Sequence, residues 1–347
     1  MRARCVGVMG RGVVVIGVLF LPLMSGSPVM AGGVVGNGNR TSCSEAAFDA
    51  ALVGGGSVTF NCGAQPFTLT VTAPKTIALD TSLDGGGLLT LSGGGKLPIF
   101  FVNPGAAMSL NGATLRDGRF SFGGAIYSEG TLTVTNCTFS HNHAPGPGDG
   151  GAIDNYGTLT VTNSTFIQNG TYGVSGAIEN NGTLTVTNST FSRNRASVGG
   201  AIASAGPLTI TNCTFSRNRA AYYGSGGAIY SAGDTIIQNT ILANSGRGRN
   251  CVGPVIDGGH NLRWPLKDNS CVGTYGNPKL ARLTNHGGLT STFDLRPGSA
   301  AINAGDNAIC TAAPVSNADQ RGFVRPGTGA TNCPIGAYEF NAPIPSP

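Results

Sequence analysis

Charged side chains are scarce in this chain: Asp, Glu, Lys and Arg together make up 11% of its 347 residues. The formal net charge is +5, but three of the 21 basic residues, Arg2, Arg4 and Arg11, lie in the first 31 positions. The rest of the chain therefore carries 18 basic and 16 acidic side chains, a net charge of +2. This near balance gives no overall reason to expect nucleic acid or an anionic membrane as a partner.

The sequence also lacks the short motifs that carry common enzyme chemistry. It contains no GxSxG, HExxH or CxxC motif and no phosphate-binding loop. The one pattern that suggests a metal is His-Asn-His at 141–143, but the aligned segments of later repeats read Gln-Asn-Gly and Arg-Asn-Arg. We therefore expect no catalytic residues, no metal site and no cofactor.

Residues 1–31 have the features of a signal peptide. The segment has a basic start, the apolar run GVVVIGVLFLPLM and small residues, Val29 and Ala31, before the expected cleavage position. The run is too short to span a bilayer comfortably. We expect export, cleavage after Ala31, and no transmembrane segment in the remaining chain.

Glycine is abundant, at 56 residues or about one in six, and threonine and asparagine are also frequent. This composition disfavours helices and suits short strands joined by tight turns. Of nine cysteines, Cys5 lies in the leader, and an even count of eight remains for disulfides in an exported chain. The spacing suggests three local pairs: Cys43 with Cys62, Cys251 with Cys271, and Cys310 with Cys333.

One phrase occurs four times. GGAIYSEGTLTVTNCTFSHN at 123–142 returns at 150–169, 175–194 and 199–218 with a few substitutions. A period of 24 to 27 residues is typical of a solenoid. Within each copy, TLTVT alternates apolar and polar residues, as expected for a strand with one buried face. Stacked copies could bury these faces together, each adding a rung of about 4.8 Å.

Aligned copies define columns of identical residues. Asparagine tolerates left-handed backbone angles, so asparagine columns predict corners, whereas apolar columns predict the interior. The first asparagine column is Asn111, Asn136, Asn163, Asn188, Asn212 and Asn239, and the second is Asn142, Asn169, Asn194, Asn218 and Asn244. The interior columns are Ile126, Ile153, Ile178, Ile202 and Ile229, and Phe139, Phe166, Phe191 and Phe215 with Leu115 and Ile241 at the ends.

Cys137 and Cys213 share one column with Ser164 and Ser189. They lie three rungs apart, about 14 Å by strand spacing, whereas a disulfide needs α-carbons within about 7 Å. We expect small, inward-facing residues here. A bond from either cysteine to a different cysteine remains the alternative.

The sequence predicts an all-β, right-handed parallel β-helix, since parallel crossovers are overwhelmingly right-handed. We divide the chain into a leader (1–31), an N-terminal cap with the first strands (32–75), β-helix coils (76–245) and a C-terminal capping module (246–347). The apolar pattern around Phe48, Ala51 and Leu52 predicts a short helix, held by Cys43–Cys62, that covers the open end of the solenoid. The C-terminal module contains the other two predicted disulfides, and we expect its Asp306, Asp319, Arg321 and Arg325 to hold loops together through ion pairs.

The GGAI and FxxN motifs, as GGAI at 123–126 with FSHN at 139–142, resemble the repeats of chlamydial polymorphic outer membrane proteins. The wider pattern is similar to bacterial surface proteins of the right-handed parallel β-helix class, which also includes pectate lyases. Residues 295–339 are similar to the choice-of-anchor module of such proteins. The resemblance implies a secreted or surface location in a bacterium.

Function on a solenoid is expected where the copies differ. One outward column is Tyr127, Asp154, Glu179, Ala203 and Tyr230. Asp154 and Glu179 would lie on adjacent rungs about 5 Å apart, a spacing that suits a retaining glycosidase pair or a cation. The alternative is a pair of solvated surface acids.

A second variable region contains Arg193, Arg195, Arg217 and Arg219 on neighbouring rungs, in line with His141 and His143. Arginine pairs bidentately with carboxylates, so an acidic polysaccharide is a candidate ligand, with solvated surface arginines as the alternative. We therefore expect a monomeric, exported, non-enzymatic adhesin-like or structural protein that binds carbohydrate. The alternative is a polysaccharide lyase or glycoside hydrolase of the pectate-lyase-like class.

Overall fold

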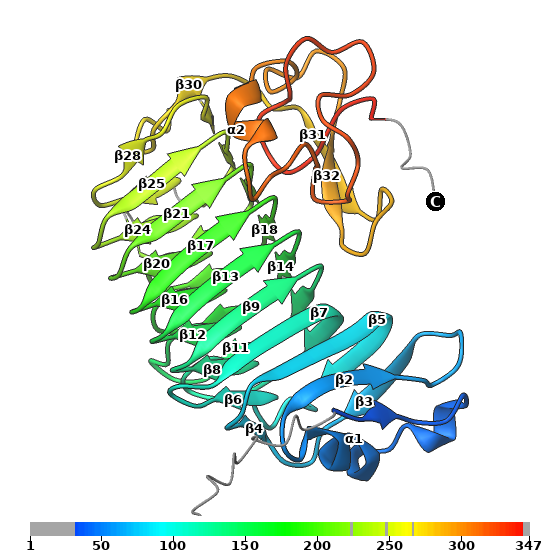
Figure 1. The fold of residues 1–347 in the computed structure, drawn as a ribbon. Coiled ribbons are helices and arrows are strands. Elements are labelled where there is room, and N and C mark those ends of the chain that lie inside the picture. Colours follow the sequence, from blue (N-terminus) through cyan, green and yellow to red (C-terminus); the bar gives the residue numbers. More distant parts are fainter. Residues whose placement is uncertain (1–31, 223–224, 247–248, 266, 343–347) are drawn as a thin grey trace, which may run out of the picture.

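A computed structural model describes residues 32–342 except 223–224, 247–248 and 266. The predicted leader lies outside these residues. The described chain winds into a parallel β-helix in which each sequence repeat forms one coil (Figure 1). Consecutive coils pair in register, so that Leu132, Leu159 and Leu184 lie one above another. The fold predicted from the repeat is confirmed.

Three parallel sheets form the walls of the helix. The first sheet combines the threonine strands and the phenylalanine strands, which are continuous in the early coils. Its threonine strands are β9 (Thr131–Thr135), β13 (Thr158–Thr162), β17 (Thr183–Thr187), β21 (Leu208–Thr211), β25 (Thr235–Gln238) and β28 (Ile256–Asp257). Its phenylalanine strands are β10 (Thr138–Ser140), β14 (Thr165–Ile167), β18 (Thr190–Ser192), β22 (Thr214–Ser216), β26 (Ile241–Ala243), β29 (Leu262–Trp264) and β30 (Thr274–Tyr275). The early strands are β1 (Val34–Val35), β2 (Gly56–Phe60), β3 (Phe67–Thr70), β5 (Thr81–Ser92) and β7 (Ala107–Arg116).

The second sheet contains the Gly-Ala-Ile segments, and the third is a narrow ladder at the remaining corner. The second consists of β4 (Lys75–Ile77), β6 (Phe100–Val102), β8 (Ile126–Ser128), β12 (Ile153–Asn155), β16 (Ile178–Asn180), β20 (Ile202–Ser204), β24 (Ile229–Ser231) and β27 (Cys251–Val252). The third consists of β11 (His143–Ala144), β15 (Gly170–Thr171), β19 (Arg195–Ala196) and β23 (Arg219–Ala220).

The phenylalanine column stacks through the interior. Rings of Phe139, Phe166, Phe191 and Phe215 lie 4.7–4.8 Å apart between centroids, with interplanar angles of 2–4°. All four are fully buried. The column continues at Leu242, which pairs with Phe215, so the assignment of Ile241 to this position was wrong: Ile241 pairs with Thr214 and faces outward.

Both asparagine columns lie at corners, but only the second forms a continuous ladder. In that column Asn142, Asn169 and Asn194 each donate from the side-chain amide to the next asparagine, at 2.9–3.0 Å. The first column, from Asn136 to Asn239, adopts φ of 45–54°. The assignment of Asn111 to this column was wrong: Asn111 pairs with Thr135 within β7, and Gly112 holds the left-handed corner of that coil with φ of 59°. Asn244 does not belong to the ladder. It is exposed. The backbone amide of Gly246 donates to the Asn218 carbonyl, so Ser245, and not Asn244, occupies the position that follows Asn218 in the column.

Small polar side chains line the cysteine column. Cys137 and Cys213 are buried and unpaired, as expected from their separation. The Ser164 hydroxyl accepts from the Cys137 backbone amide at 3.1 Å. Burial raises the pKa of both thiols to about 12, so neither is reactive at neutral pH.

The N-terminal cap is built as the apolar pattern predicts. Helix α1 (Glu45–Leu52) begins at Ser44, whose side chain accepts from the Ala47 amide, and buries Phe48 and Ala51. A short 3₁₀ turn (Arg40–Ser42) precedes it. Lys75 anchors the helix to the first coil through ion pairs with Glu45 at 2.5 Å and Asp49 at 2.6 Å.

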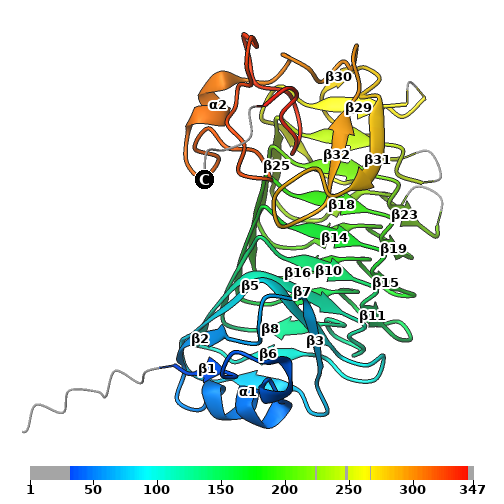
Figure 2. The ribbon, with the colours of Figure 1, turned by 90° about the vertical axis from the view of Figure 1, so that its right-hand side faces the viewer.

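The C-terminal module follows the last coils and also packs along the side of the solenoid (Figures 1 and 2). It contains the antiparallel hairpin of β31 (Leu280–Thr284) and β32 (Thr292–Leu295) and helix α2 (Asn307–Thr311). The Gln320 side chain bonds to the outward hydroxyls of Thr165 and Thr190 at 2.8 and 2.6 Å. The outward-facing Ile241 joins an apolar cluster with Leu295 and Ile335 of the module. The outer face at these positions is therefore covered, although the threonine pattern predicts exposure to water.

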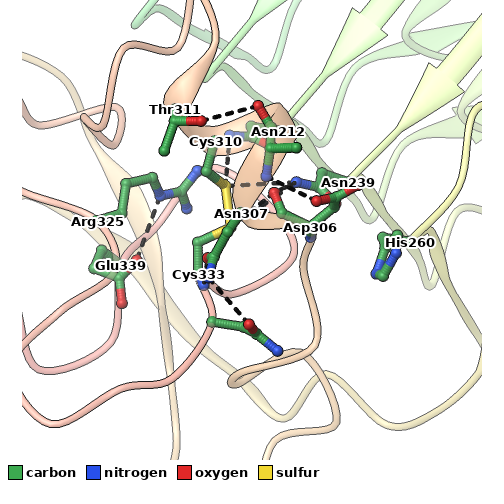
Figure 3. Close-up of a disulfide and its surroundings, with 12 residues drawn as sticks. Asn212, Asn239, His260, Asp306, Asn307, Cys310, Thr311, Arg325, Cys333 and Glu339 are labelled. Atoms are coloured by element: carbon green, nitrogen blue, oxygen red, sulfur yellow. Dashed lines mark hydrogen bonds and ion pairs between the residues drawn. A yellow bond between two sulfur atoms is a disulfide. The ribbon is translucent and has the colours of Figure 1, made fainter.

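Three disulfides join the pairs suggested by spacing: Cys43–Cys62, Cys251–Cys271 and Cys310–Cys333. The last lies against the first asparagine column, where the amides of Asn212 and Asn239 both approach the Cys310 sulfur at 3.5 Å (Figure 3). Within the described residues, no helix combines the length and apolar character needed to cross a membrane.

Candidate functional site

The outward column of the second sheet runs in register along its strands. Tyr127 on β8 pairs with Asp154 on β12, which pairs with Glu179 on β16, followed by Ala203 and Tyr230. The predicted adjacency of the two acids is therefore present. Tyr230 lies two rungs beyond Glu179 and is separated from it by Ala203.

Both acids are buried rather than solvated. Asp154 has no exposed surface and Glu179 is 9% exposed. Among the residues that the structure describes, neither Asp154 carboxylate oxygen has a hydrogen-bond partner, and neither does Oε2 of Glu179. The alternative of two solvated surface acids is thus wrong, because burial depends on the surrounding loops and not on strand alternation alone.

The environment of the pair favours protonated carboxyls. Burial, with the negative charge of Asp149 on the preceding loop, raises the pKa of Asp154 to about 7. Burial and the charges of Asp149 and Asp154 raise the pKa of Glu179 to about 9. An isolated carboxylate away from water is costly, so the proton is held instead. At neutral pH the pair can therefore donate a proton or a hydrogen bond.

An aromatic groove of about 400 Å³ lies beside Tyr127 on the N-terminal side of the acid pair. Phe101 pairs with Tyr127 one rung below it, and the ring centroids of Tyr127 and Tyr156 are 5.7 Å apart. Phe101 meets Phe120 edge-on at 5.3 Å. The groove is lined by Thr76, Phe101, Val102, Asn103, Phe120, Phe122, Tyr127, Glu129 and Tyr156.

The groove carries one acidic group at its edge. Burial, together with the neighbouring Glu129 carboxylate, raises the pKa of Tyr127 to about 12, so its hydroxyl remains protonated. The groove combines flat apolar surfaces with a phenol and a carboxylate, a combination suited to an amphipathic ring such as a sugar.

Sequence reasoning identified Tyr127 but missed the rest of the groove. Phe101 belongs to the irregular early coils, where the repeat is too degenerate to place it in the Tyr127 column. Phe120 and Phe122 alternate in the segment RFSF before the first clear repeat, and that alternation was the available signal. Tyr156 follows β12 directly and is 48% exposed.

The predicted arginines form a basic ridge at and beside the third sheet, on later rungs than the groove. Arg195 pairs with Arg219 across β19 and β23, and Arg193 and Arg217 occupy the corner just before them. All four are exposed, and none forms an ion pair within the described part of the chain. Arg193 and Arg217 adopt φ of 57° and 64°, in the left-handed region that arginine rarely occupies.

Two exposed tyrosines accompany the basic ridge. Tyr172 directly follows β15 and is 72% exposed. Tyr222 lies two residues after the end of β23 at Ala220 and is 65% exposed. His143, one rung below Gly170, packs edge-on against Tyr172 at 5.7 Å. His141 and Gln168 hold the same left-handed corner on earlier rungs.

The polar cluster of the C-terminal module is structural. Asp319 and Arg321 pair at 2.7 Å, and Arg321 lies between the rings of Phe323 and Tyr338 at 4.0 and 3.8 Å. Arg325 pairs with Glu339 in the interior (Figure 3). Asp306 differs from the ion-pair expectation, because its carboxylate caps α2 by accepting from the Ala308 amide. Across the residues that the structure covers, no group of three or more His, Cys, Asp and Glu side chains could hold a metal ion.

The fold defines a right-handed parallel β-helix with an aromatic groove and a basic ridge on separate walls. In agreement, the family model described as "Right handed beta helix region" matches residues 100–245. No curated protein and no solved structure matches the chain. The matched region contains most of the groove and all of the ridge.

Proposed function

We propose that this chain is an exported, non-enzymatic β-helix protein of the cell surface or extracellular space of a bacterium, adhesin-like in role, which binds carbohydrate. The observation that carries the proposal is the aromatic groove of Phe101, Phe120, Tyr127 and Tyr156. Edge-on and tilted rings offer apolar faces to a pyranose ring, and Glu129 can accept from its hydroxyls. The signal-like segment and three disulfides support export, since disulfides persist in oxidising compartments.

The basic ridge supports a preference for acidic glycans. Four arginines without acidic partners in the described chain lie on two adjacent rungs, whose strands are about 4.8 Å apart along the solenoid, and guanidinium binds carboxylate bidentately. The exposed Tyr172 adds an aromatic surface next to them. We infer that the ridge binds the carboxylates of a uronic-acid polymer.

A binding assay tests the two surfaces separately. The chain from Gly32 onward is measured against neutral glycans and polygalacturonate by retention on immobilised polymer. We expect Tyr127→Ala with Tyr156→Ala to weaken retention on neutral glycans at least tenfold. Arg193→Ala with Arg217→Ala should instead weaken retention on polygalacturonate. The retention that remains should depend less on salt concentration. Wild-type protein that is retained by no glycan would contradict the proposal.

One observation favours a second candidate, hydrolysis of a glycosidic bond. Asp154 and Glu179 lie on adjacent rungs and have raised pKa values, and both oxygens of Asp154 and Oε2 of Glu179 have no hydrogen-bond partner within the described chain. Retaining glycosidases place two carboxyls about 5–5.5 Å apart, one protonated as the acid and one ionised as the nucleophile. The column holds no Lys or Arg to serve as the base of a lyase.

Product release separates the two candidates. The same polymers are incubated with the protein and assayed for new reducing ends and for unsaturated products. The binding proposal predicts neither. Reducing ends that disappear in Asp154→Asn and in Glu179→Gln would establish the hydrolase and overturn the non-enzymatic assignment.

A further inference from the structure

The outward side chains of the threonine strands form a two-dimensional array. Strands β9, β13, β17 and β21 pair in register without a bulge, so each outward residue lies directly above its counterpart. Nine of these residues are exposed or half-buried threonines, and we call them the threonine face. They are Thr131, Thr158 and Thr183; Thr133, Thr160, Thr185 and Thr209; and Thr135 and Thr162.

The array has fixed repeats in both directions. Neighbouring strands lie about 4.8 Å apart, and outward residues along one strand recur about every 6.7 Å. Threonine is β-branched and stiff at its first torsion, so its hydroxyl and methyl groups have few allowed orientations. Beneath the face, Leu159 and Val161 and their counterparts are fully buried. The face therefore rests on a closely packed interior.

The threonine face is chemically uniform. It carries no charged and no aromatic residue on these rungs. The hydroxyls of Thr133, Thr160 and Thr185 make no hydrogen bond to any other part of the chain that the structure describes. The C-terminal module packs on the adjacent phenylalanine strands through Thr165 and Thr190 instead. Figure 1 shows β9, β13, β17 and β21 side by side toward the viewer with no segment in front of them.

These properties point to a ligand that is itself a rigid lattice. A flexible ligand would gain nothing from regular spacing, whereas a crystal surface can meet every position of the array at once, and many weak contacts then add up. Sugar recognition uses aromatic faces and polar hydrogen-bonding groups, as in the groove, and this face has no aromatic residue. Its hydroxyl and methyl groups recur at regular intervals of about 4.8 Å and 6.7 Å, and a lattice of ordered water can offer oxygen atoms to such a regular array.

We propose that the threonine face binds the surface of ice. The threonine hydroxyls would occupy positions of water molecules in the ice lattice. The methyl groups would order the water between neighbouring strands. The site is independent of the groove and of the basic ridge, which occupy other walls of the solenoid.

Two assays of ice growth test the proposal directly. The chain from Gly32 onward is tested for thermal hysteresis and for uptake into a growing ice hemisphere. Thr160→Tyr places a bulky ring at the centre of the face and should reduce both readings several-fold. The matched control, Thr138→Tyr, lies outward on β10 beyond the corner and should leave both unchanged. Melting curves establish that each variant is folded.

Each outcome decides the proposal. Wild-type protein excluded from ice and without hysteresis overturns it, as do equal losses in the two variants. Retention on microcrystalline cellulose that Thr160→Tyr abolishes, without any effect on ice, would reassign the face to a crystalline polysaccharide. Tyr127→Ala with Tyr156→Ala should leave ice uptake intact, so failure of the glycan proposal remains distinguishable.

Discussion

At the scale of single residues, Asp154 and Glu179 stand apart because a stable β-helix does not require them. The equivalent outward positions of other rungs hold tyrosine and alanine. Burying an ionised carboxyl without a partner opposes folding, and the raised pKa values express that cost. Register alone predicts that the two are neighbours. Their burial could not be predicted, because it arises from loops whose paths the repeat does not specify.

The raised pKa values predict that the protein is more stable in mild acid. In the unfolded chain these carboxyls ionise near their ordinary pKa of about 4, while in the fold they ionise near pH 7 and pH 9. Their contribution to stability is thus fully present below about pH 4 and is lost as the pH rises toward 9. We expect the melting temperature to fall across this window.

Glu179→Gln should flatten that dependence and raise the melting temperature at pH 8–9, because the buried group can no longer ionise. The exposed Glu129, which follows β8 two rungs from Glu179, provides the control: Glu129→Gln should follow the wild-type curve. Melting curves recorded from pH 5 to pH 9 give the comparison. An unchanged slope in Glu179→Gln would show that the carboxyl reaches solvent.

At the scale of elements, the second asparagine column ties the coils together at their corners. The Asn194 amide donates to the Phe166 carbonyl at 3.0 Å and to Asn218, and its oxygen accepts from both nitrogens of Asn169. The side chains of Asn142, Asn169 and Asn194 therefore each bond to both adjacent coils. All of these groups are buried, so none can turn to water if one residue is removed.

Asn194→Ala should lower the free energy of unfolding by roughly 3 kcal/mol, since it leaves several buried polar groups unpaired. Asn181→Ala, at an exposed turn of the same coil, should change it by less than about 0.5 kcal/mol. Urea denaturation of the two variants measures the difference. Equal changes in the free energy of unfolding would mean that the asparagine ladder stabilises the fold no more than an exposed turn does.

The sequence predicts these columns well as long as the spacing is constant. Six positions separate Asn212 from Asn218, as in the earlier copies, but only five separate Asn239 from Asn244. Asn244 consequently rotates out of the ladder, and Ser245 takes its place. Ile241 was misplaced one position along the same coil. A degenerate coil loses the identical residues that fix register, so pattern alone fails there.

At the scale of the whole molecule, the C-terminal module binds a surface made much earlier in the chain. Gln320 contacts Thr165, 155 positions away, and Asn188 donates to the Ala318 carbonyl. Contacts at such separation leave no periodic signal. The sequence therefore predicts the module and its disulfide but not the face of the solenoid that it covers.

Gln320 gives a direct test of this docking. Its side chain is buried and bonds to Thr165, Thr190 and Thr290, so Gln320→Ala should cost about 2–3 kcal/mol and open the module first. Limited proteolysis should then cut within residues 276–342 before the coils. The exposed Asn332→Ala serves as the control. Simultaneous cleavage of module and coils would show that they unfold as one unit.

The side-docked module also changes how the molecule would respond to force. A stack of coils pulled along its axis separates one rung at a time, because each rung is held only by its neighbours. Contacts from Asn163 to Asn239 join four successive rungs to one disulfide-closed module. A pulling force therefore acts on those four rungs together, in shear, and they resist extension as one unit. We expect extension to begin in the N-terminal coils, which lie outside this group of contacts.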